Sequence, residues 1–185
     1  MIHLGLKARH FIPDAHYESI YDIDFETLGK DGVTTLLLDL DNTLISYDDT
    51  LAGEELSRFL AGLKEQGFKR VVISNSRQRR LSTFCDPLAL DYVAFAKKPF
   101  RSGFKKALSI AGSTKEESVL IGDQLMTDVY GAKRFGIRVL LVKPIKKRTE
   151  KWYTRFNRRL EQKMLRKIEK KHPERFRSLR LDDRA

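Results

Sequence analysis

The residues Leu36-Leu37-Leu38-Asp39-Leu40-Asp41-Asn42-Thr43 are the most informative part of the sequence. Its first part is an unbroken apolar run, which is typical of a parallel strand that is buried on both faces. Two carboxylates follow where the run ends. Because residues at i and i+2 point the same way in an extended chain, Asp39 and Asp41 can face one ligand.

Four further apolar runs follow, separated by amphipathic stretches with helical spacing. The runs cover residues 71–74, 92–96, 119–122 and 139–142, and the helical stretches cover about 56–66, 78–85, 102–111 and 126–135. This alternation predicts an α/β fold with a Rossmann-like, open, mainly parallel five-stranded sheet flanked by helices. Such sheets bind ligands at the carboxyl ends of their strands.

A chain of 185 residues has room for one full core. We expect an N-terminal extension packed on the core (1–33), the core itself (34–144) and a basic amphipathic helical segment (145–185). Asp22 and Asp24 also form an i, i+2 pair, but no apolar run precedes them. We interpret them as capping or surface residues.

Three features of the sequence indicate the cytoplasm. No apolar stretch approaches the roughly 20 residues that a membrane span needs. The first residues lack the pattern of a secretory signal. The single cysteine, Cys85, cannot form an internal disulfide.

The net charge of +11 is concentrated at the C-terminal end. Residues 143–185 contain 17 Lys or Arg and 6 Asp or Glu, whereas residues 1–142 contain 19 of each kind. A neutral body with a basic tail predicts an anionic partner for the tail. The alternative is a solvated, partly disordered tail.

The tail also has an apolar stripe, in which every fourth residue is large and apolar: Trp152, Phe156, Leu160, Met164 and Ile168. Lysines and arginines occupy the opposite face. A basic amphipathic helix of this kind can lie on an anionic membrane surface. Alternatively, the stripe packs on the sheet or on a second subunit and leaves the basic face outside.

Polar residues lie where several runs end, and parallel strands bring such ends together. Ser74 ends the second run, Lys98 follows the third, and Asp123 follows the fourth. Asp39 can accept a phosphoryl group as a nucleophile, and Asp41 can transfer the proton. Two carboxylates work on a phosphate only if positive charge offsets the repulsion, so a hard cation and a lysine are required.

These residues are similar, in order, to the four motifs of the haloacid dehalogenase-like (HAD) phosphatases: Asp39-Leu-Asp41-Asn42-Thr43, Ser74-Asn75, Lys98-Pro99 and Gly122-Asp123-x4-Asp128. The resemblance implies that Asp39 is the nucleophile and Asp41 the acid/base. It also implies that Mg²⁺ is held by the side chains of Asp39 and Asp123 and the main-chain carbonyl of Asp41.

The same resemblance assigns the remaining motif residues. It implies that the substrate phosphate is bound by Ser74, Asn75, Lys98 and Asn42. Thr43 and Asp128 support the arrangement.

The intervals between the motifs are too short for a cap domain. Thirty residues separate Thr43 from Ser74, and twenty-three separate Ser74 from Lys98. An uncapped site is open, so it can accept a phosphate that projects from a protein, a nucleic-acid end or a lipid headgroup.

More closely, the chain resembles the YqeG-type phosphatases of HAD subclass IIIA, which lack a cap and include phosphatidylglycerophosphate phosphatases. The resemblance lies in Ser19-Ile20-Tyr21-Asp22-Ile23-Asp24 and in residues 122–132. It implies removal of the terminal phosphate of phosphatidylglycerophosphate, at the inner face of the membrane, with the basic segment on the anionic surface.

Two alternative functions remain. One differs in its substrate and in the partner of the tail, and the other belongs to a different class of protein. In the first, a capless phosphatase acts on nucleic-acid ends or phosphoproteins and its tail binds phosphate backbones. In the second, a non-catalytic scaffold uses the fold and the tail to bind RNA or ribosomes. The complete motif set argues against the scaffold, which has no need of Asp39, Asp41 and Lys98 together.

Overall fold

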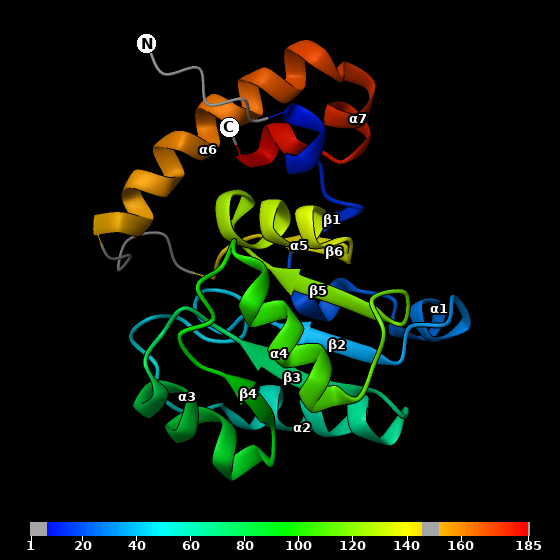
Figure 1. Ribbon diagram of the computed structural model, residues 1–185, viewed down its shortest axis with the longest axis vertical. Helices are drawn as coiled ribbons and strands as arrows, with labels where there is room; N and C mark the ends of the chain where they lie inside the picture. Colours follow the sequence, from blue (N-terminus) through cyan, green and yellow to red (C-terminus); the bar gives the residue numbers. More distant parts are fainter. Residues whose placement is uncertain (1–6, 146–151, 185) are drawn as a thin grey trace.

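The computed structural model of the chain describes residues 7–145 and 152–184, and for residues 152–159, 183 and 184 it describes the course of the backbone alone. Its centre is one sheet of parallel strands in the order β1-β6-β5-β2-β3-β4 (Figure 1). The strands are β1 (Ala15–Tyr17), β2 (Thr35–Leu38), β3 (Lys69–Ile73), β4 (Asp91–Val93), β5 (Ser118–Gly122) and β6 (Arg138–Val142).

The predicted α/β class and parallel sheet are confirmed, but the predicted number of five strands is wrong. The sixth strand is β1, which comes from the N-terminal segment and pairs in parallel with β6, with Ala15 opposite Leu140. This strand has three residues, all partly exposed. It therefore lacks the buried apolar run by which the other strands are recognisable.

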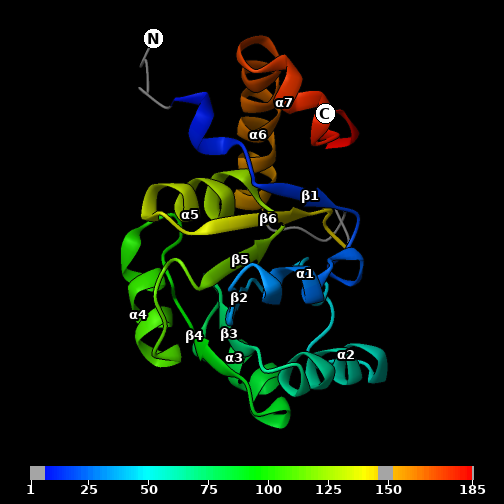
Figure 2. The same ribbon diagram turned by 90° about the vertical axis from the view of Figure 1, so that its right-hand side faces the viewer.

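Both faces of the sheet are covered by helices (Figure 2). Leu36 and Leu38 of β2 belong to one core cluster, and Leu37 belongs to the other, as expected for a strand buried on both sides. One face packs against α1 (Phe25–Lys30), α2 (Glu54–Glu65) and α3 (Gln78–Cys85). The other packs against α4 (Arg101–Ala111) and α5 (Tyr130–Phe135).

The stretch predicted as one helix over 126–135 is divided in two. A π-helical turn, η4 (Leu125–Val129), precedes α5, and the carbonyl of Gln124 accepts hydrogen bonds from the amides of both Asp128 and Val129. Gly136 ends α5, as predicted, and it adopts the left-handed conformation. The π turn places an extra residue immediately before the helix, at the carboxyl end of β5.

The N-terminal segment is fixed by local caps. Its short helices are η1 (Ala8–Phe11) and η2 (Ile20–Asp22). Asp22 and Ser19 form a capping box on η2, and Asp24 caps α1 by accepting a hydrogen bond of 2.9 Å from the amide of Thr27. The interpretation of Asp22 and Asp24 as capping residues is confirmed.

The C-terminal segment forms α6 (Trp152–Lys171), α7 (Pro173–Ser178) and η5 (Leu181–Arg184), beyond the β1–β6 edge of the sheet and beside η1 (Figures 1 and 2). Met164, Leu165 and Ile168 are buried in the core cluster that also contains Phe11. Two residues of the apolar stripe, Met164 and Ile168, therefore pack on the core, and Leu160 is partly exposed. The side chains of Trp152 and Phe156 lie outside the described residues.

No helix in the described ranges is both long enough and apolar enough to cross a membrane.

Candidate active site

The predicted site residues meet at the edge of the sheet where the strands end. Asp39 follows β2, Ser74 follows β3 and Asp123 follows β5, while Lys98 lies in the loop after β4. Each of these four side chains is buried. Because the strands are parallel, their carboxyl ends form one edge of the sheet, the carboxyl edge.

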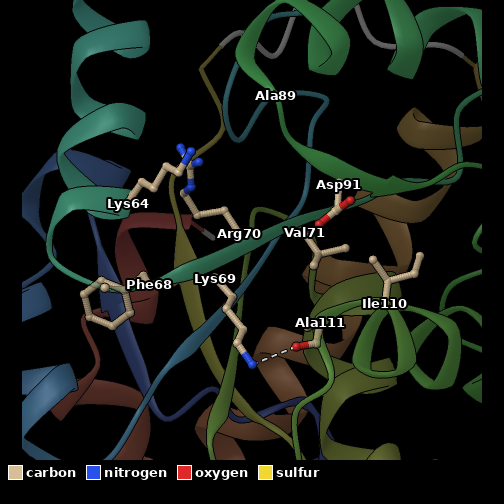
Figure 3. Close-up of a pocket in the computed structure, with 10 residues that line it drawn as sticks. Lys64, Phe68, Lys69, Arg70, Val71, Ala89, Asp91, Ile110 and Ala111 are labelled. Carbon is tan, nitrogen blue, oxygen red and sulfur yellow. Dashed lines mark hydrogen bonds between the residues drawn. The ribbon is translucent and has the colours of Figure 1, made fainter.

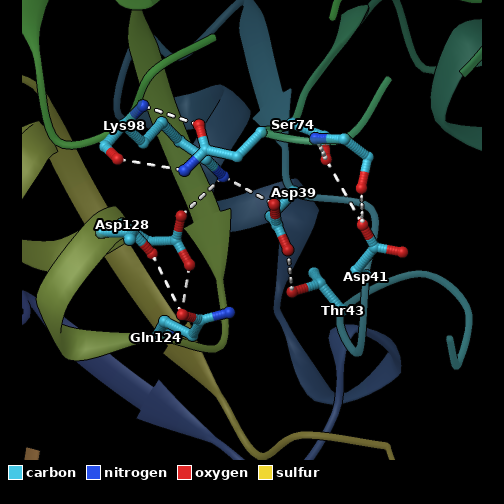
Figure 4. A network of polar contacts seen from close by, with 10 residues as sticks. Asp39, Asp41, Thr43, Ser74, Lys98, Gln124 and Asp128 are labelled. Carbon is cyan, nitrogen blue, oxygen red and sulfur yellow. Dashed lines mark hydrogen bonds and ion pairs between the residues drawn. The ribbon is translucent and has the colours of Figure 1, made fainter. Parts of the chain in front are cut away.

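Lys98 is the centre of the polar network (Figure 4). Its Nζ lies 2.6 Å from Oδ1 of Asp39 and 2.7 Å from Oδ1 of Asp128. Thr43 Oγ1 donates a hydrogen bond of 3.3 Å to the other carboxylate oxygen of Asp39. One ammonium group therefore positions two acids, one that follows β2 and one in η4.

The charges in this buried region do not balance. Ligand oxygens of Asp39, Asp123 and Asp128 all lie within 4.8 Å of one another. Burial raises the pKa of Asp39 well above its usual value, and the other carboxylates add to this effect against the opposing charge of Lys98. A divalent cation would supply the missing positive charge, and carboxylate oxygens are suitable ligands for a hard cation. These residues therefore fit a divalent metal.

Lys98 itself remains charged. Burial lowers the pKa of its ammonium group, but the carboxylates of Asp128 and Asp39 outweigh burial, and the net shift is upward. The site thus keeps a fixed positive charge against which an anion can bind.

Asp128 reaches the cluster because Gly122 leaves room for it. A Cβ on Gly122 would lie 2.6 Å from Cγ of Asp128, which is too close for real atoms. The π turn orients Asp128, and its Oδ2 accepts a hydrogen bond of 3.0 Å from the amide of Gln124. π turns are often found at functional sites.

Asp41 is held by residues that sequence reasoning missed. Arg80, on α3, pairs with Oδ1 of Asp41 at 2.6 Å, and Ser76 Oγ donates to Oδ2 at 2.5 Å. Arg80 also donates to the carbonyls of Ser46 and Asp49, so it ties Asp41 to the loop that follows β2. Arg80 lies in the run Arg77-Gln78-Arg79-Arg80, which has the composition of a solvated helix face, and nothing in the sequence distinguishes it.

Asn75 lies at the site, and both the oxygen and the nitrogen of its side chain form hydrogen bonds with the backbone of Lys98. Its Oδ1 accepts from the amide of Lys98 at 2.7 Å, and its Nδ2 donates to the carbonyl of Lys98 at 3.0 Å. Ser74 Oγ lies 3.5 Å from the Asp41 carboxylate. Asn42 has a φ of 66°, and its backbone amide donates a hydrogen bond to the carbonyl of Ile45. This bond closes the turn after Asp41.

No cap domain interrupts the described segments that follow β2 and β3, as predicted. The segment from β2 to α2 (39–53) and the segment from β3 to α3 (74–77) are fully described and contain no helix. A hollow of 340 Å³ lies elsewhere, at the amino ends of β3 and β4, where Lys64, Arg70 and Ile110 are among the lining residues (Figure 3). The residues of the acidic cluster do not contribute to it.

Comparison with known proteins agrees with this geometry. A model of the HAD-hydrolase-like family matches residues 95–155. The probable phosphatase YqeG of Bacillus subtilis is 36% identical over 166 residues, which are 90% of this chain and 96% of YqeG. The chain therefore belongs to the HAD-like hydrolases, in the group of YqeG, and its enzyme class is that of a phosphatase.

Two further matches are more distant. The glyceraldehyde 3-phosphate phosphatase of Pyrococcus furiosus is 28% identical over 111 residues, or 55% of this chain and 45% of that protein. An uncharacterised protein of Listeria monocytogenes has a crystal structure that superposes with a TM-score of 0.51, at 20% identity, over 64% of this chain and 85% of that one. The second likeness concerns the fold alone.

Proposed function

We propose that the chain is a magnesium-dependent phosphomonoesterase in which Asp39 attacks the phosphorus atom, and that its substrate is phosphatidylglycerophosphate. The observation that carries the proposal is the position of Asp39. Its buried carboxylate is held by Lys98 and lies within 4.8 Å of ligand oxygens of Asp123 and Asp128. A carboxylate in this setting is oriented, and the phosphate that it attacks can be charge-compensated.

The reaction has two steps. An oxygen of Asp39 forms a bond to phosphorus while the bond from phosphorus to the alcohol oxygen breaks, and Asp41 gives that oxygen a proton. Asp41 then takes a proton from water, whose oxygen attacks the phosphorus of the aspartyl phosphate. Inorganic phosphate leaves and Asp39 returns to its carboxylate form.

The other residues bind and orient the reacting groups. Arg80 and Ser76 orient Asp41 through the contacts described above. Ser74 and Lys98 are the proposed phosphate ligands, and Asn75 holds the Lys98 backbone in register with them. The turn at Asn42 places its backbone at the same edge. Thr43 and Asp128 fix Asp39 and Lys98.

The proposed metal ligands are the side chains of Asp39 and Asp123 and the main-chain carbonyl of Asp41. Magnesium, when bound, offsets the repulsion between the phosphate and the carboxylates.

Two observations support a lipid substrate. The carboxyl edge is open, which suits a phosphate that stays attached to a bilayer. The C-terminal helices also have an exposed basic face, formed by Lys163, Arg166, Lys170, Lys171, Arg175, Arg177 and Arg180. Each such residue contributes about 1 kcal/mol of attraction near an anionic membrane surface. We therefore place the enzyme at the cytoplasmic face, bound peripherally.

The test is a substrate panel with two variants. The unaltered protein should release phosphate from phosphatidylglycerophosphate in the presence of Mg²⁺, and faster than from nucleotide, sugar, phosphopeptide or DNA-end monoesters. Asp39→Asn should lose at least about a thousandfold in kcat, because the amide is a poor nucleophile. Asp91→Asn, an exposed residue at the start of β4, should keep full activity.

The panel separates the proposal from its alternatives. Faster turnover of DNA ends or phosphopeptides would replace the lipid by those substrates and leave the chemistry intact. Turnover by Asp39→Asn at the parental rate would contradict the mechanism. A protein that hydrolyses none of these monoesters but binds RNA would be the scaffold.

A further inference from the structure

Four large apolar side chains are exposed in loops of the carboxyl edge. Leu51 is 58% exposed, Phe95 57%, Phe100 65% and Ile145 50%. Leu51 lies in the loop after β2, the two phenylalanines lie in the loop after β4, and Ile145 follows β6. In Figure 1 the strand arrows point toward the side where these loops lie. Single exposed apolar residues are ordinary, but four around one edge mark an interaction surface.

Each of the four lies close to a site residue, and three of them are held by a backbone hydrogen bond. The amide of Phe95 donates to the carbonyl of Ser76 at 3.0 Å, and Ser76 contacts Asp41. The amide of Ile145 donates to the carbonyl of Asn42, also at 3.0 Å. These apolar groups therefore keep a fixed position relative to the catalytic turn.

The remaining two lie near site residues along the chain. Phe100 is hydrogen-bonded to Lys97, the residue before Lys98, at 2.8 Å. Leu51 lies two residues after Asp49, whose carbonyl accepts from Arg80 at 3.1 Å.

The backbone conformation after β4 points the side chain of Phe95 toward solvent. Phe95 and Lys97 both have positive φ values, 48° and 55°, which are uncommon for residues with side chains. Between them Ala96 is buried, and its amide donates to the carbonyl of Ser74 at 2.9 Å. Ala96 and Lys98 thus face the protein while Phe95 and Lys97 face solvent. Such a conformation persists only where the surroundings enforce it.

Basic side chains accompany the apolar ones. Arg77 and Arg79 are exposed after β3, and Lys97 and Arg101 are exposed on either side of Phe100. Asp48 and Asp49, next to Leu51, reduce this charge but do not reverse it. Aromatic and aliphatic groups interspersed with Lys and Arg are the composition of surfaces that insert into anionic lipid headgroups.

We infer that Leu51, Phe95, Phe100 and Ile145 form an apolar rim that inserts into the headgroup region of an anionic membrane. Insertion of the rim orients the carboxyl edge so that Asp39 faces the membrane. The inference rests on the proposed lipid phosphatase function and names how that site meets its substrate. A headgroup phosphate then reaches the site while its acyl chains remain in the bilayer. The basic helices α6 and α7 add attraction without inserting, because Met164, Leu165, Ile168, Phe176 and Leu179 are occupied in the core.

The double variant Phe95→Asn, Phe100→Ser tests the rim without disturbing the fold. Asn tolerates the positive φ at position 95. Position 100 is the N-cap of α4, where Ser is more favourable than Phe. Ile110→Gln removes an exposed apolar side chain from the far end of α4 and is the matched control. Binding is measured by flotation with vesicles of phosphatidylglycerol and phosphatidylcholine. Turnover is measured on substrate in the same vesicles and on p-nitrophenyl phosphate.

The double variant should bind the vesicles about tenfold more weakly, since two rings no longer enter the lipid. Its turnover of vesicle-borne substrate should fall with binding, while turnover of p-nitrophenyl phosphate stays at the parental value. Ile110→Gln should match the parent in every assay.

Equal vesicle binding by the parent and the double variant would overturn the proposed insertion of the rim, since the basic helices alone would then account for membrane attachment. If the parent protein binds no anionic vesicles, the proposed membrane insertion is also overturned, and the rim would instead be a contact surface for a protein partner. Weaker binding by the double variant, with no hydrolysis of any lipid phosphate by the parent, would support the rim and refute the lipid substrate. Failures of the rim and of the substrate proposal are therefore distinguishable.

Discussion

Gly122 controls how closely Asp128 approaches the rest of the acidic cluster. It ends β5, and the space that a Cβ would fill is occupied by the Asp128 carboxyl group. Asp128 in turn holds Lys98, whose Nζ also contacts Asp39. A single hydrogen atom in place of a methyl group thus keeps three site residues in contact.

Gly122→Ala should destabilise the protein by about 1–3 kcal/mol, because the added methyl group displaces Asp128 in a close-packed site. It should also lower kcat/KM for phosphomonoesters at least tenfold, through the loss of Lys98 positioning. Urea denaturation and initial rates measure the two effects.

Gly62→Ala is the matched control for that substitution. Gly62 lies inside α2, and a methyl group added there would meet no neighbouring atom within 4 Å. Alanine at this position should stabilise the protein by about 0.5–1 kcal/mol and leave activity unchanged. An equal loss of activity in both variants would contradict the role given to Gly122.

The motif residues could be placed from the sequence because each follows a recognisable strand. Asp39 and Asp123 follow buried apolar runs, and parallel strands bring such ends together. Arg80 and Ser76 could not be found in this way. Their contacts with Asp41 span 39 and 35 positions of the sequence and depend on how α3 sits against the sheet.

Among the elements, those with long periodic patterns were predictable and the short ones were not. The five strands β2 to β6 and the helices α2 to α4 follow from apolar runs and helical spacing. β1 has three residues and its partner strand is far along the chain, so its pairing is a tertiary effect. The π turn before α5 depends on the space beside Gly122, which no spacing in the sequence encodes.

The helix α6 gives a prediction at the element scale. Ile168 is fully buried in the cluster with Phe11 of η1. Ile168→Ala should lower the free energy of unfolding by about 2–5 kcal/mol, through lost burial and the cavity left behind. Chemical denaturation measures the change.

Lys170→Ala, on the exposed side of the same helix, should change stability by no more than about 0.5 kcal/mol. A loss below about 1 kcal/mol for Ile168→Ala would mean that α6 does not depend on its packing against the core.

At the scale of the whole molecule, the stability of the fold should depend on a divalent cation. Asp39, Asp123 and Asp128 repel one another in a buried region where Lys98 offsets only part of their charge. Mg²⁺ at about a hundred times its dissociation constant should stabilise the folded state by about 2.7 kcal/mol. That gain corresponds to a rise in Tm of roughly 5–10 °C, measured by calorimetry with and without a chelator.

Asp123→Asn should abolish most of this rise, while Asp91→Asn should show it in full. The same rise in both variants would show that the cation binds elsewhere.

The edge position of β1 determines when the sheet can be completed during synthesis. β1 leaves the ribosome before any other strand, and its neighbour β6 leaves after all the others. Ala15 and Leu140 face each other across 125 positions, and closing so long a loop is entropically costly until the strands between them have formed. We therefore expect the sheet to grow outward from β2, β3 and β5, with the first strand to be made among the last to be paired.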